Sequence, residues 1–238
     1  PVHAEVIAIG RMWDVSPQTT TGYGQLFGEF PSAMLPDEIL TDSPGRIRAM
    51  FVNGANPAVC IPDQRKAVAA LRALDLLVSI DPYMSATAQL CHYILPPLLQ
   101  IERDDVLFGP RTERLLGHVP FVQWIPGAVA PPAGSELIDD WHLYWALAER
   151  LGLPLTVGSH QILAAAEDRD GPARAPSTRE LLATIFAGSR VPFETVLASP
   201  DGVMCQDEEF VAPPRAEAAG RFTLAAADVL DEIASVAA

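Results

Sequence analysis

The residues best suited to chemistry lie where a predicted strand meets a loop rich in glycine and asparagine. An apolar run at 47–52 leads directly into the sequence NGANP at 53–57. Gly54 accepts backbone conformations that side chains disfavour, and proline cannot continue a strand, so a turn is predicted there. Backbone amides in such a loop can bind phosphate. Asp81, which follows a second apolar run at 76–80, can accept hydrogen bonds from ribose or a base.

These residues are expected to meet at one edge of a parallel sheet. Apolar side chains at helical spacing over 64–74 predict a helix between the two strands, and a third short strand is expected after it. Ligands of open α/β sheets bind at the carboxyl ends of the strands. The residues alone therefore indicate a nucleotide-binding βαβ unit. A sheet in which Asp81 merely caps a turn is the alternative.

Two adjacent aspartates, Asp139 and Asp140, precede a helix predicted over 141–151 and ended by Gly152. Either aspartate can accept hydrogen bonds from the free amides of the first helical turn. Extended segments are predicted at 5–11 and 221–224, with a strand pair within 111–124. Further helices are predicted over 158–166 and 178–187, a short helix or turn over 191–197, and a last helix or a frayed tail over 228–236.

The composition is that of a folded protein with a strongly acidic surface. The chain has 238 residues, 49% of them hydrophobic, and a formal net charge of −14. This charge argues against nucleic acid or an anionic membrane surface as a partner. An anionic nucleotide would need local arginines, for which Arg103, Arg111 and Arg114 are candidates. Because no apolar run reaches eighteen residues, no membrane insertion is expected.

The sequence offers no metal site and no catalytic motif. Cys60, Cys91 and Cys205 are far apart, so they predict neither a zinc site, nor an iron–sulfur cluster, nor a disulfide framework. The absence of disulfides favours a reducing compartment, so a cytoplasmic location is expected. No catalytic triad, phosphate-binding P-loop or zinc-protease motif is present. A single lysine, Lys66, beside many alanines indicates a GC-rich bacterial genome.

An ordered set of motifs over roughly 25–160 resembles the molybdopterin oxidoreductases, the family of dimethyl sulfoxide reductase, formate dehydrogenase and periplasmic nitrate reductase. The set consists of FVNGANP (51–57), LLVSID (76–81), Thr87-Ala88, ILP (94–96), Glu102-Arg103, Asp140-Trp141 and AERLG (148–152). Two departures stand out. Cys91-His92 replaces the usual Ala-Asp before Leu-Pro, and Asp104-Asp105 replaces a glycine-containing turn.

The resemblance implies a Rossmann-like domain that binds a bis(molybdopterin guanine dinucleotide) cofactor carrying molybdenum. By this carry-over, Gly54 and Asn56 lie against the dinucleotide phosphates, and Asp81 holds the guanosine. Arg103, in place of the usual lysine, supplies positive charge. Asp140 pairs with the guanine edge, because a carboxylate accepts from both the ring N–H and the amino group. Asp139 then remains as the helix cap.

The expected organisation has three parts. Residues 1–45 form a loop-rich segment packed on the core, 46–160 the Rossmann-like domain, and 161–238 a helical extension leading toward a missing cofactor domain. We therefore expect a middle fragment of a molybdenum-dependent oxidoreductase, inactive alone, whose partners are the cofactor and the remaining domains of the parent enzyme. Metal ligands and any iron–sulfur cluster are expected in those other segments.

Two other readings of the sequence remain. The first is a non-catalytic α/β nucleotide-binding or scaffold subunit that uses the same fold to dock partners. The second is an NAD-type Rossmann protein. It is weakened because the loop at 53–57 lacks the GxGxxG pattern and the following helix begins several residues late.

Overall fold

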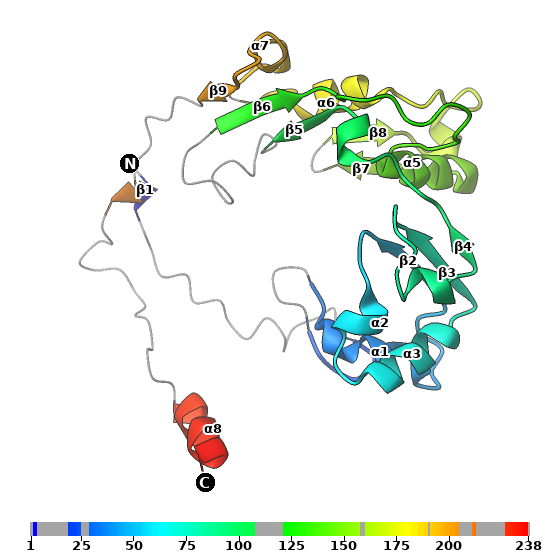
Figure 1. Cartoon of the computed structure of the whole chain (residues 1–238), viewed down its shortest axis with the longest axis vertical. Coiled ribbons are helices and arrows are strands. Elements are labelled where there is room, and N and C mark those ends of the chain that lie inside the picture. Colours follow the sequence, from blue (N-terminus) through cyan, green and yellow to red (C-terminus); the bar gives the residue numbers. More distant parts are fainter. Residues whose placement is uncertain are drawn as a thin grey trace.

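The computed structural model describes residues 2–3, 19–24, 29–107, 121–157, 160–189, 191–204, 211–212 and 227–237. Over these residues the fold is mixed α/β, with a parallel three-stranded sheet flanked by helices, as the sequence predicts (Figure 1). The segments predicted as extended at 5–11 and 221–224 lie outside the described residues. Among the helices described, none is long and apolar enough to cross a membrane.

The parallel sheet has the strand order β2-β3-β4. Its strands are β2 (Ala49–Asn53), β3 (Leu76–Ile80) and β4 (Tyr93–Ile94). The central strand β3 is almost wholly buried, which fits its continuous apolar sequence. The register places Asn53 opposite Ile80, so β2 and β3 end at the same level of the sheet. The loop after β2 and Asp81 after β3 therefore share one edge.

Three helices pack against this sheet: α1 (Leu35–Leu40), α2 (Pro57–Cys60) and α3 (Gln64–Arg72). The predicted helix at 64–74 is thus confirmed as α3. Its buried side chains join those of α1, β2 and β3 in one hydrophobic cluster. The cluster comprises Ile39, Val52, Ala58, Ala70, Leu71, Leu74 and Leu77.

A second, antiparallel sheet consists of β5 (Asp105–Leu107), β6 (Phe121–Ile125) and β9 (Val203–Met204). Helices α6 (Thr178–Ile185) and α7 (Phe193–Leu197) confirm two of the predicted helices. Side chains from β6 and from the segment around these helices share a cluster made of Val122, Trp124, Phe186, Phe193 and Val196. This cluster contains residues from both sides of position 160. The division into 46–160 and 161–238 stays a prediction.

Helix α6 begins with a capping box, in which Ser177 and Glu180 exchange side-chain and backbone hydrogen bonds. The Arg174 guanidinium also binds the Glu180 carboxylate at 2.7 Å. Together with the hydrogen bonds from Ser177, this contact lowers the pKa of Glu180 to about 2. The carboxylate therefore stays ionised through the physiological pH range, and its negative charge interacts favourably with the N-terminus of α6.

Helix α5 (Asp140–Leu151) ends as predicted at Gly152, which adopts the left-handed conformation at φ 70°. The helix predicted over 158–166 is wrong. Residues 160–163 form the strand β8 (His160–Leu163), which pairs antiparallel with β7 (Leu155–Val157). Strand pairing and the packing of Leu163 beneath Trp145 override the local helical spacing.

The remaining elements are short or peripheral. Parallel strands β1 (Val2–His3) and β10 (Val211–Ala212) pair with each other, and α8 (Ala227–Ala237) matches the last predicted helix. The 3-10 turns are η2 (Ser32–Met34), η3 (Ala88–Leu90), η4 (Gln100–Glu102) and η5 (Ala166–Asp168).

Truncation of Leu77 tests the parallel-sheet core. Its side chain is fully buried in β3, so Leu77→Ala should lower the free energy of unfolding by about 2–5 kcal/mol through lost burial and the cavity left behind. Urea denaturation followed by circular dichroism measures the change. Val59→Ala is the control, because Val59 is 54% exposed and its truncation should cost less than about 0.5 kcal/mol. Equal small effects from both substitutions would contradict the assignment of this core.

Candidate functional site

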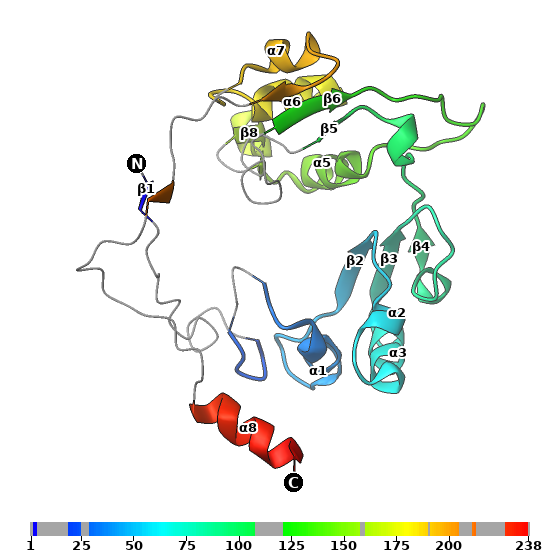
Figure 2. The ribbon, with the colours of Figure 1, turned by 60° about the vertical axis from the view of Figure 1, so that its left-hand side comes forward.

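The carboxyl edge of the parallel sheet faces helix α5, and the ends of β2 and β3 are directed toward it (Figure 2). At this edge the Gly54 N–H donates to the Ile80 carbonyl oxygen at 2.9 Å, which fixes the start of the loop. Gly54 has φ +57°, a conformation that favours glycine. A methyl group at Gly54 would meet no atom within 4 Å, so the space beside it is open.

The side chain of Asn56 holds the loop in place through hydrogen bonds to Thr87. Its Oδ1 atom accepts hydrogen bonds from the Thr87 N–H at 3.0 Å and from the Thr87 hydroxyl at 2.8 Å. The Thr87 hydroxyl in turn accepts from the Ala58 N–H at 3.0 Å. Thr87 is fully buried, so these bonds satisfy groups that water cannot reach. Within the described part of the chain, no protein group bonds the Asn56 Nδ2 donors, which are available to a ligand.

Asp81 stands directly after β3 and is 8% exposed. Its Oδ1 atom accepts from the Tyr83 N–H at 2.8 Å, so the carboxylate does cap the turn that follows the strand. Its Oδ2 atom has no hydrogen bond among the described residues. The turn-capping role and a ligand-binding role are therefore compatible, one on each oxygen.

Asp140, the first residue of α5, joins three segments of the chain. Its Oδ1 atom accepts from Arg103 Nη1 at 3.1 Å and from the Trp141 N–H at 2.9 Å. Its Oδ2 atom accepts from Asn53 Nδ2, at the end of β2, at 3.3 Å. Arg103 also reaches Asp105 Oδ2 at 3.5 Å. The structure thus brings the predicted residues Arg103 and Asp140 together beside the loop that carries Gly54.

One of the nitrogen donors of Arg103 has no partner among the described residues. Its Nε atom is buried and bonds no protein group in the described structure, although the side chain as a whole is 26% exposed. A buried donor without a partner is costly, and Arg103 is held here by its contacts with Asp140 and Asp105. Arg111 and Arg114, the other predicted cations, lie outside the described residues.

The prediction that Asp139 caps α5 through its side chain is wrong. Asp139 occupies the N-cap position, but its carboxylate makes no capping hydrogen bond. Instead, Oδ2 accepts from the Thr178 hydroxyl, which also accepts from Trp141 Nε1 at 3.2 Å. Asp139 Oδ1 is buried and bonds no group among the described residues. The Asp139 carboxylate bonds the Thr178 hydroxyl instead of the free amides of α5, so it connects the start of α5 to the start of α6.

The two departures from the family pattern have structural roles. His92 Nδ1 accepts from the Leu77 N–H at 2.9 Å, and the His92 N–H donates to the Leu77 carbonyl at 2.9 Å, so the imidazole extends the β3–β4 pairing. Asp104 Oδ1 accepts from the Gly127 N–H at 3.0 Å. Burial raises the pKa of the Cys91 thiol, so it stays protonated near neutral pH. The described residues hold no group of three metal-ligating side chains.

Asn53 and Thr87 belong to the motifs named above, but the sequence predicts a role for neither of them. Asn53 reaches Asp140 across 87 positions, and Thr87 reaches Asn56 across 31 positions. No pattern in one sequence reveals such long-range partners. The one available signal was that Asn53 is a polar residue at the end of an apolar strand run.

Comparison with known proteins places these residues in a described sequence family. The family model named "Molybdopterin oxidoreductase" matches residues 26–150, which is more than half of the chain. A formate dehydrogenase subunit alpha of Methanocaldococcus jannaschii is 35% identical over 121 residues, 51% of this chain. The thiosulfate reductase molybdopterin-containing subunit PhsA of Salmonella typhimurium is 31% identical over 117 residues, 49% of this chain.

The solved structure of acetylene hydratase from Pelobacter acetylenicus matches 51% of this chain at 31% identity, with a TM-score of 0.44. These relatives are much longer proteins. The match spans 16% of the formate dehydrogenase subunit and 14% of the thiosulfate reductase subunit.

The role of the Asn56 side chain can be tested by substitution. Asn56→Ala removes the acceptor of two hydrogen bonds from buried Thr87 and should lower the free energy of unfolding by about 1–3 kcal/mol. Asn56→Asp keeps an acceptor oxygen and should retain most of this stability. Urea denaturation compares the two variants. An equal loss in both, or no loss in either, would contradict the role assigned to the Asn56 oxygen.

Proposed function

Because the chain belongs to the molybdopterin oxidoreductase family, we propose that it binds the guanine dinucleotide part of a molybdenum bis(molybdopterin guanine dinucleotide) cofactor within a larger oxidoreductase. The observation that carries this proposal is the convergence of Asn53, Arg103 and Asp140 at the carboxyl edge of the parallel sheet. Ligands of open α/β sheets bind at that edge.

The described residues fit a guanine nucleoside by their donors and acceptors. Asp140 presents a carboxylate, which complements the ring N–H and amino donors of guanine. Asp81 Oδ2, with no hydrogen bond among the described residues, is an acceptor for a ribose hydroxyl. Gly54 leaves open space for a ligand beside the backbone. Adenine has no ring N–H on its pairing edge, so the carboxylate favours guanine over adenine.

Asp140 must be held in place for this task. Arg103 fixes one oxygen at 3.1 Å, and the Trp141 N–H fixes the same oxygen at 2.9 Å. Asn53 holds the other oxygen at 3.3 Å, the longest of these contacts. We infer that guanine displaces Asn53 rather than Arg103, because a long hydrogen bond from a neutral amide is weaker than a hydrogen bond between two oppositely charged groups.

The phosphates need positive charge, which this edge supplies sparingly. Arg103 contacts the carboxylates of both Asp105 and Asp140. The Nδ2 atom of Asn56, whose side-chain oxygen is already used by Thr87, is a donor for phosphate oxygens. The amides of the loop that begins at Gly54 add further donors. On this proposal Arg103 serves both Asp140 and the nucleotide.

In the complete enzyme the bound molybdenum centre supplies the two-electron chemistry, while residues of this chain bind and orient the nucleotide end. We propose that this chain contributes no catalytic residue and no metal ligand, and that it is inactive alone. Its partners are then the cofactor and the other domains of a cytoplasmic bacterial enzyme. Those domains would carry the metal ligand and any iron–sulfur cluster.

Nucleotide titration tests the proposal. The purified chain should bind GMP and GDP saturably, with a dissociation constant of roughly millimolar to high micromolar, because most of the cofactor surface is absent from these ligands. AMP should bind about tenfold or more weakly, since it cannot donate to Asp140 in the same way. Isothermal calorimetry or amide NMR spectra measure both affinities.

Two variants sharpen this test. Asp140→Asn should abolish the preference for guanine. Asp105→Asn is the control: Asp105 also contacts Arg103, at 3.5 Å, but is not proposed to bind the base, so the preference should remain. Preferential binding of NADH would favour an ordinary dinucleotide enzyme and overturn the proposal. No binding of any nucleotide would show that this chain holds no preformed site, as expected for a scaffold subunit.

A further inference from the structure

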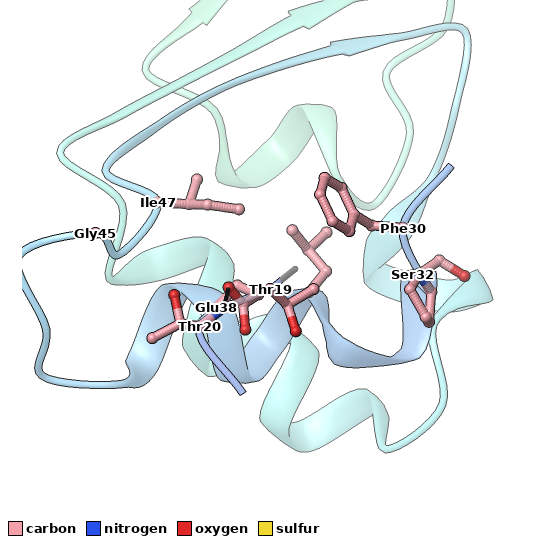
Figure 3. A pocket seen from close by; sticks show the side chains of 9 residues that line it. Thr19, Thr20, Phe30, Ser32, Glu38, Gly45 and Ile47 are labelled. Atoms are coloured by element: carbon pink, nitrogen blue, oxygen red, sulfur yellow. Dashed lines mark hydrogen bonds between the residues drawn. The ribbon is translucent and has the colours of Figure 1, made fainter. Parts of the chain in front are cut away.

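A pocket of about 380 Å³ lies beside α1, away from the carboxyl edge of the sheet (Figure 3). It is bordered by the segment that leads into β2, at Gly45 and Ile47, whereas the nucleotide site lies beyond the opposite end of that strand. Phe30, Leu35 and Ile47 supply much of its mainly apolar wall. Thr20 and the carboxylate of Glu38 border its polar side.

Glu38 is an ionised group held in a largely buried place. Its residue is 9% exposed. Oε2 accepts from the Thr20 N–H at 2.7 Å, and Oε1 accepts from the Thr21 N–H at 3.2 Å and the Thr21 hydroxyl at 3.1 Å. Burial opposes ionisation, but these hydrogen bonds outweigh it and lower the pKa of Glu38. The carboxylate is therefore charged at neutral pH.

No cation among the described residues neutralises this charge. The neighbouring Asp37 pairs with Lys66 Nζ at 2.6 Å, whereas Glu38 forms no such ion pair within the described ranges. Buried charges in proteins are normally paired, and the hydrogen bonds from Thr20 and Thr21 bring no positive charge to the carboxylate. A carboxylate offers about four acceptor positions. Three are used here, so Oε2 retains one.

We propose that this pocket binds a small organic cation, a primary ammonium on a short unbranched apolar chain. The ammonium group donates to Glu38 Oε2, and the apolar chain packs against Phe30, Leu35 and Ile47. A volume of about 380 Å³ is at the lower end of ligand pockets, which suits a molecule of this size. The net charge of −14 draws cations toward the protein. This site is independent of the proposed nucleotide site.

Titration of the full chain with n-pentylammonium chloride tests the proposal, with n-pentanol as the neutral ligand of equal length. The ammonium should bind saturably and at least about tenfold more tightly than the alcohol, because it brings a positive charge to the carboxylate and the alcohol does not. Amide NMR spectra should show the largest shifts at Thr20, Thr21 and Leu35. Equal affinities for the two ligands, or no saturable binding of the ammonium, would overturn the proposal.

Two variants separate the roles of charge and apolar wall. Glu38→Gln should remove the preference for the ammonium over the alcohol. Because that change also touches the Thr20–Thr21 turn, Phe30→Ala provides a second test and should weaken the binding of both ligands. Phe51→Ala is the matched control, since Phe51 is 38% exposed, close to 45% for Phe30, and does not line the pocket. Unchanged ammonium binding in Phe30→Ala, or an equal loss in Phe51→Ala, would overturn the proposed site.

Discussion

The contact on which the candidate site depends is the pairing of Asp140 with Arg103 and Asn53. It connects the end of β2, the segment after η4 and the first turn of α5 at a single carboxylate. Asp140 also lies at a helix N-terminus, where a negative charge is favoured by the exposed amides. The hydrogen bond from Asn53 to Asp140 joins the end of β2, just before the Gly54 loop, to the start of α5. The geometry of the proposed nucleotide site therefore depends on a partly exposed ion pair between Arg103 and Asp140.

A second constraint is electrostatic. The edge carries several carboxylates and one described cation, within a chain of net charge −14. Such a site suits a ligand that presents hydrogen-bond donors, as guanine and ribose do. Such a site can bind a pyrophosphate only where arginine and backbone amides donate hydrogen bonds to the phosphate oxygens. This asymmetry explains why we assign the nucleoside end of the cofactor to the side chains and the phosphate end to the loop amides and Arg103.

Much of the fold could be predicted because local and global signals agree. The continuous apolar run at 76–80 became the buried central strand, and Gly152 ended α5 in a left-handed conformation. The error at 158–166 arose because β8 is specified by its partner strand and by Leu163 packing under Trp145, not by local spacing. Tertiary contacts of this kind leave little trace in a single sequence.

The site was predictable only in part for the same reason. The loop and Asp81 follow from strand topology, so their edge could be named in advance. The side-chain partners could not. Asp139 bonds Thr178 rather than its own helix, and Asn56 uses its oxygen on Thr87, because each choice depends on residues 31 to 39 positions away.

The most direct test of the account is to map where GDP binds, with amide NMR spectra of the assigned chain recorded during a titration. A nucleotide site at the carboxyl edge predicts that the largest saturable shifts fall on Gly54, Tyr83, Thr87 and Trp141, whose amides lie around that edge. Saturable binding with shifts confined to residues away from this edge would contradict it.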